Sequence, residues 1–188
     1  MEEDDDTELI EEFKKTGQLP LVWQWTSREF VCAANILRDQ HELRQKEPAR
    51  VPEAESLWKL IGPMMLLYGL ALENVLKGLL VAQGVDATST GELNRKLKTH
   101  NLLWLWKQAD LPNNGAREEV LENLHWSIEA GKYPVGTKPD IDAPAPVWVA
   151  LTNVDEILNL LHIAEDALRG VQPNRAFEKT NLLSLCRR

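Results

Sequence analysis

Apolar residues gather most densely in one stretch, Ile61 to Gly84, where they occupy almost every position from Met64 to Ala82. A helix that is apolar nearly all round has to be surrounded by other elements. Pro63 stands near the predicted start, where a missing N–H costs least, and Gly84 follows the last apolar residue, where a left-handed cap needs no side chain. The pattern therefore predicts a central, buried helix.

This stretch is also long enough to cross a membrane, which takes about 20 residues. Glu73, Asn74 and Lys77 interrupt its middle, and charges at that depth are unfavourable in lipid. Glu73 and Lys77 are four positions apart, in the favourable order for a helical ion pair. We therefore expect no membrane partner. The polar group is either a structural ion pair or the lining of a cleft.

Apolar residues at helical spacing predict further helices on both sides of the central one. They cover residues 26–45, 100–110, 116–131 and 149–169. No stretch alternates with a period of two and no hairpin turn signal is present, so no strand is expected. Because most connections are short, the predicted fold is all-α, a single-domain antiparallel bundle of about five helices.

Capping signals predict where these helices begin and end. Thr26 opens a capping box, and Thr99 is the expected N-cap of the short helix that His100 begins. Gly131 stands where the next helix should end. The segment that follows, residues 132–147, holds four prolines and no helical period. Long irregular connections of this kind often carry functional residues.

The formal charge of −8 is concentrated at the N-terminus, where eight acidic residues fall within the first twelve positions. Without these eight, 21 of the 29 acidic residues remain, against 21 Lys and Arg. The rest of the chain is therefore near neutral and lacks the broad basic surface of a strong nucleic-acid binder. Local binding of phosphate stays open.

This charge distribution divides the chain into an acidic, flexible arm (residues 1–20), a helical bundle (21–170) and a C-terminal tail (171–188). The arm is interpreted as a solvated, poorly ordered segment with one short amphipathic turn around Leu9 and Phe13. The alternative is an arm that contacts a basic partner or shields a nucleic-acid site.

The chemistry of the remaining residues argues against several classes of protein. Cys32 and Cys186 are the only cysteines, which fits a reducing cytoplasm better than a disulfide scaffold. No basic segment followed by an apolar one indicates a secretory signal, so we expect a cytoplasmic protein. The four histidines and two cysteines have no metal-ligand spacing, and no Gly-rich phosphate loop is present. Neither a metal nor another cofactor is expected.

Four segments line up in an informative order. They are FVCAANIL (30–37), LLYGLALENVLKGLL (66–80), THNLLWL (99–105) and LHWSIEAGKYPVG (124–136). In this order they resemble the HEPN superfamily (higher eukaryotes and prokaryotes nucleotide-binding), over Thr26 to Leu168. The resemblance implies a helical bundle that often forms homodimers. It also implies an RNA- or nucleotide-interacting protein of toxin–antitoxin, phage-defence or RNA-processing systems, with an antitoxin or another system component as a possible protein partner.

Active members of this superfamily are metal-independent endoribonucleases that carry an Arg, four to six residues, and then a His. The chain has Arg95, four residues and then His100. A His can exchange protons with a ribose 2′-hydroxyl or the leaving oxygen, and an Arg can hold the phosphate. The resemblance thus implies that Arg95 and His100 are catalytic. The residues that would flank the cleft are Glu73, Asn74, Lys98, Lys132 and Tyr133.

One alternative to catalysis stays open. The segment Lys132–Tyr133–Pro134 could be the counterpart of the family motif, but Lys132 stands where an Arg is expected and no His follows at the right distance. The chain would then be a non-catalytic interaction or scaffold module. Such a module would bind a partner protein through the bundle or through its acidic arm.

Overall fold

The computed structural model describes residues 2–46, 55–88, 91–132 and 154–172. Within these ranges the chain forms α-helices and one short 3-10 helix, and no strand. They are α1 (Glu2–Gly17), α2 (Pro20–Lys46), α3 (Glu55–Ala82), η2 (Arg95–Leu97), α4 (Leu102–Gln108), α5 (Gly115–Lys132) and α6 (Val154–Val171). The prediction of an all-α fold is confirmed. The described ranges hold six α-helices rather than about five.

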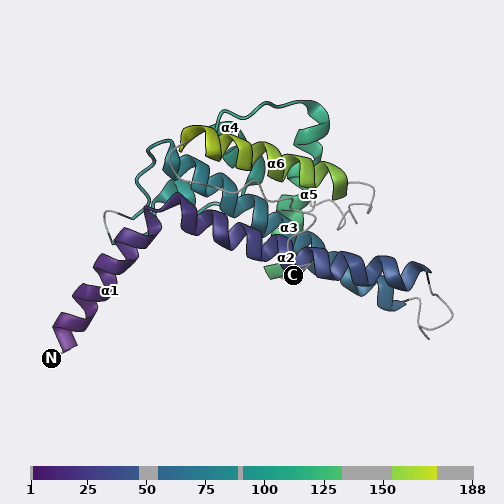
Figure 1. Ribbon diagram of the computed structural model, residues 1–188, viewed down its shortest axis with the longest axis horizontal. Coiled ribbons are helices and arrows are strands. Elements are labelled where there is room, and N and C mark those ends of the chain that lie inside the picture. Colours follow the sequence, from purple (N-terminus) through teal and green to yellow (C-terminus); the bar gives the residue numbers. More distant parts are fainter. Residues whose placement is uncertain (1, 47–54, 89–90, 133–153, 173–188) are drawn as a thin grey trace, which may run out of the picture.

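Helix α3 is the centre of the bundle, and α2, α4, α5 and α6 all pack against it (Figure 1). Helices α2 and α3 run antiparallel along their length. The side chains of Met64, Leu72, Leu76 and Leu79 are fully buried. In the described part of the chain one segment, Leu60–Ala82, is long and apolar enough to cross a membrane, and 78% of its most apolar window is buried by the rest of the protein. The apolar surface of α3 is therefore used for packing.

Two glycines let neighbouring helices approach α3 closely. A Cβ atom on Gly78 would lie 2.9 Å from Trp23 Cβ and 3.2 Å from the carbonyl oxygen of Pro20, both on α2. A Cβ atom on Gly69 would lie 2.9 Å from Cγ1 of Ile128 on α5. The absence of a side chain at these positions sets the distance between α3 and each neighbour.

Helix α2 begins earlier than the sequence predicted. Its first residue is Pro20, whose fixed φ suits the first helical position, and not the residue after Thr26. The predicted capping box is therefore wrong. Thr26 lies inside α2, and its Oγ1 donates a hydrogen bond to the carbonyl oxygen of Val22 at 3.1 Å.

Helix α1 occupies the N-terminal segment in which the sequence predicted only one short amphipathic turn. The acidic run falls in its first turns and Lys14 and Lys15 in its last, which is the arrangement that the helix dipole favours. An ion pair between Glu11 and Lys14 at 2.8 Å adds local support. From composition alone we expected a solvated, poorly ordered segment. Composition does not register that acidic residues come first and basic residues last, which is the order that favours a helix.

Of the two glycines expected to follow the end of a helix, Gly84 does and Gly131 does not. Gly84 has φ of 100° and follows α3, as predicted. The N–H groups of Gly84 and Val85 donate to the carbonyl oxygens of Val81 and Leu80, which completes a Schellman cap. Gly131, however, lies inside α5 and does not end it.

We expect Gly78→Ala to lower the free energy of unfolding by about 1–2 kcal/mol. The new methyl group would push against the backbone of α2, which outweighs the better helix propensity of alanine. Gly170→Ala on α6 is the matched control, because nothing lies within 4 Å of its Cβ position. There we expect a gain of up to about 1 kcal/mol. Urea denaturation measures both, and equal effects would contradict the close approach.

The buried pair of Tyr68 and Asn35 makes stability fall at alkaline pH. The Tyr68 hydroxyl donates to Asn35 Oδ1 at 2.8 Å, and burial raises the pKa of Tyr68 from 10.0 to about 12. Tyr68 therefore stays protonated to a higher pH in the folded state than in the unfolded chain. The resulting stability is present below pH ~10 and lost as pH rises towards ~12, by about 3 kcal/mol in total. The variant Tyr133→Phe leaves Tyr68 as the single tyrosine. An ultraviolet titration of this variant should show Tyr68 losing its proton with a midpoint well above pH 10. A midpoint near 10 would contradict the burial.

Candidate functional site

A buried carboxylate lies at the middle of α3. Glu73 is almost fully buried, and its Oε1 accepts a hydrogen bond from Lys77 Nζ at 2.7 Å, so the predicted ion pair is confirmed. Lys77 is equally buried. A charge in such surroundings has to be paired and hydrogen-bonded. Lys77 satisfies one oxygen of Glu73 and leaves the second for another donor.

His100 provides this second partner. Its Nδ1 lies 2.8 Å from Oε2 of Glu73, and the ring is 38% exposed. Because a carboxylate only accepts hydrogen bonds, we assign the proton to Nδ1. Nε2 then carries the lone pair of the neutral ring, and no hydrogen-bond partner of Nε2 occurs among the described residues. The arrangement can exchange a proton with a bound molecule, because Glu73 fixes both the orientation and the tautomer of the imidazole.

The backbone around His100 is held as well. Asn101, and not the predicted Thr99, caps α4, since its Oδ1 accepts from the N–H of Trp104 at 2.8 Å. His100 therefore precedes the helix instead of lying in its first turn. Its carbonyl oxygen accepts a hydrogen bond from Nδ1 of His125 on α5 at 3.0 Å. The site is thus fixed from α3 and from α5.

An aromatic surface borders this second contact. Trp126 is 37% exposed. The centroid of its ring lies 5.9 Å from that of His125, and the two ring planes are inclined by 44°. His125 itself is half-buried. Its contact with His100 spans 25 residues. No local signal could have revealed it.

Arg95 and Lys98 lie on the surface, in the segment that leads to His100. Arg95 is the exposed first residue of η2, five positions before His100. Within the described ranges no hydrogen bond or ion pair joins it to Glu73 or His100. Lys98 is paired with Glu92 at 3.1 Å, and both side chains are exposed. The structure therefore brings Glu73 and His100 into contact and leaves the two basic side chains in solvent.

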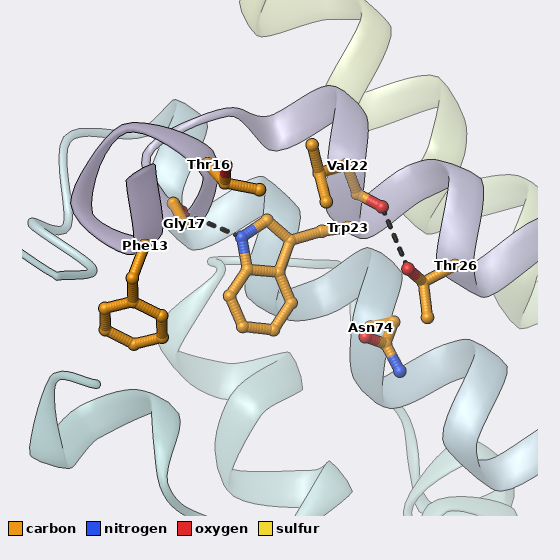
Figure 2. A pocket seen from close by; sticks show the side chains of 7 residues that line it. All are labelled: Phe13, Thr16, Gly17, Val22, Trp23, Thr26 and Asn74. Atoms are coloured by element: carbon orange, nitrogen blue, oxygen red, sulfur yellow. Dashed lines mark hydrogen bonds between the residues drawn. The ribbon is translucent and has the colours of Figure 1, made fainter. Parts of the chain in front are cut away.

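The other residues of the expected cleft lie elsewhere or outside the described part. Asn74 donates from Nδ2 to the carbonyl oxygen of Leu70 at 2.8 Å, and it lines a pocket between α1, α2 and α3 (Figure 2). Lys132 ends α5, but its side chain is outside the described residues, as is Tyr133. Lys77, which the sequence paired with Glu73 but did not place among the site residues, belongs to the site.

Two further features concern metal binding and the cysteines. Among the described residues no group of three or more His, Cys, Asp or Glu side chains could hold a metal ion. Cys32 on α2 takes part in a disulfide, whereas the sequence favoured reduced cysteines. Cys186, the other cysteine of the chain, lies outside the described residues.

Comparisons with known proteins found no counterpart: no family model, curated protein or solved structure matches the chain.

Removing the carboxylate should leave Lys77 buried without a partner. We therefore expect Glu73→Ala to lower the free energy of unfolding by about 3–5 kcal/mol. Glu92→Ala, which breaks the exposed pair with Lys98, is the control and should cost less than about 1 kcal/mol. Urea denaturation at neutral pH compares the two. If both variants lost the same small amount, Glu73 would not be a buried, paired charge.

Proposed function

We propose that the chain is a HEPN-like protein that interacts with RNA and cleaves it without a metal ion. The observation that carries the proposal is the contact between His100 Nδ1 and the buried carboxylate of Glu73 at 2.8 Å. A half-exposed imidazole held by a buried acid is suited to proton transfer. The resemblance to the HEPN superfamily supports RNA as the substrate.

In the proposed reaction the 2′-oxygen of a ribose attacks the adjacent phosphorus and the 5′-oxygen of the next nucleotide leaves. Nε2 of His100 takes the proton of the 2′-hydroxyl while water protonates the leaving oxygen, or protonated His100 delivers a proton to the leaving oxygen while water takes that of the 2′-hydroxyl. Glu73 stabilises the imidazolium that the first of these transfers creates. The products are a 2′,3′-cyclic phosphate and a 5′-hydroxyl.

Arg95 has the second role in the proposal. Its guanidinium would hold the phosphate and stabilise the charge that develops on it, because five N–H donors in a fixed plane match phosphate oxygens. Two observations support this role. Arg95 is exposed, and its side chain makes no hydrogen bond or ion pair within the described part of the chain. Lys98 and Lys96 add positive charge to the same short segment.

The setting of this activity rests on the resemblance alone. We propose a homodimer within a toxin–antitoxin or phage-defence type of system. The neutral body of the protein agrees with a local RNA site rather than an extended one.

The test is cleavage of labelled total RNA by the purified protein in excess EDTA. Wild type should cleave and produce 5′-hydroxyl ends. We expect His100→Ala to reduce the rate at least about 100-fold, and Arg95→Ala by about 10- to 100-fold. His162→Ala on α6 is the matched histidine control, and Arg44→Ala on α2 is the matched arginine control. Both should keep most of the activity.

Two results would contradict the proposal. One is a wild-type protein that leaves RNA intact under all ionic conditions tried. The other is cleavage that persists unchanged in His100→Ala, which would point to a contaminating nuclease. A circular dichroism melt of each variant separates loss of activity from loss of folding.

A further inference from the structure

Helix α1 leaves three apolar side chains largely exposed among the described residues. Leu9, Ile10 and Phe13 are 63%, 45% and 43% exposed. Their spacing places them on one side of the helix. Figure 1 shows α1 extending away from the bundle that the other described helices form. An exposed apolar face of this kind on an ordered helix indicates an interaction site.

The base of α1 is fixed firmly to the body of the protein. The Thr88 hydroxyl donates to the carbonyl oxygen of Lys14 at 2.7 Å, and the side chain of Gln18 donates to Asp86. The indole N–H of Trp23 donates to the carbonyl oxygen of Gly17 at 3.0 Å. These contacts hold the last turn of α1, so the helix is presented in a defined direction.

A pocket of about 210 Å³ continues the apolar face at the corner between α1 and α2 (Figure 2). Its walls are Phe13, Thr16, Gly17, Val22, Trp23, Thr26 and Asn74. Phe13 thus belongs both to the exposed face and to the pocket. The hydrogen bond to Gly17 fixes the ring of Trp23 on the opposite wall. The pocket is large enough for one apolar side chain of a partner.

The charge of α1 decides which partner fits. Eight of the first twelve residues are acidic, whereas the rest of the chain is near neutral. Two copies of α1 would repel each other. The acidic helix would also repel nucleic-acid phosphates and anionic lipid headgroups. A partner rich in Lys and Arg would be attracted, and its association would be faster.

We propose that α1 and the pocket at its base form a docking surface for a basic amphipathic helix of another protein. The apolar stripe of this helix would cover Leu9, Ile10 and Phe13, with one side chain inserted between Phe13 and Trp23. Its Lys and Arg residues would face the acids of α1. This inference does not depend on the proposed ribonuclease activity, because none of these residues belongs to the site around His100.

The probe is a synthetic amphipathic helix made of leucine and lysine, titrated into the purified full chain by calorimetry. A peptide of the same composition, scrambled so that its leucines share no face, is the ligand control. Phe13→Ser should weaken binding of the amphipathic peptide about tenfold, which corresponds to the loss of one apolar side chain from the contact. Leu43→Ser is the matched variant, since Leu43 is 52% exposed on α2. It should change the affinity by less than about twofold.

The remaining outcomes would overturn the proposal. The surface would not be a basic-helix site if the peptide failed to bind at low salt, or if it bound wild type and Phe13→Ser equally. A second copy would be the occupant if Phe13→Ser converted a dimer into a monomer in analytical ultracentrifugation. A lipid surface would be the occupant if wild type bound anionic vesicles and Phe13→Ser did not. Leu9→Ser serves as a second variant should Phe13→Ser fail to fold.

Discussion

The buried carboxylate of Glu73 is the constraint on which the arrangement of the site depends. A charge in the middle of an apolar helix is stable only with partners for both oxygens. Lys77, one turn later on α3, partners the first oxygen, and His100 partners the second. The need to satisfy a buried acid therefore holds an imidazole at the protein surface. The same contact that stabilises the core gives the ring a fixed orientation and tautomer.

The packing of α3 extends this constraint to the rest of the bundle. Because α3 is apolar on nearly all sides, four helices surround it. Gly69 lets α5 approach until Ile128 lies against the α3 backbone. His125 is three positions before Ile128, on the same side of α5, and from there it reaches the carbonyl oxygen of His100. A close helix contact in the core thus determines where the backbone of the site is held.

Local signals predicted those features that depend on neighbouring residues. The central helix, the pair of Glu73 and Lys77 and the left-handed cap at Gly84 follow from spacing within a few positions. Where two local signals competed, the sequence could not rank them, as with Pro20 and the capping box at Thr26. The contacts of His100 with Glu73 and His125 span 27 and 25 residues. They depend on how the helices pack, which a single sequence does not reveal.

The segment between α3 and α4 connects the two proposed surfaces physically. At its start, Thr88 and Asp86 hold the base of α1, and Asn94 closes the turn by donating from Nδ2 to the carbonyl oxygen of Asp86 at 2.7 Å. Asn94 Oδ1 also accepts from the N–H of Lys96, which fixes the beginning of η2. The segment ends at His100. The backbone of Arg95 is thus held on both sides, and mainly its side chain would have to be ordered when phosphate binds, which lowers the entropic cost. A partner bound to α1 would lie at the other end of this same segment.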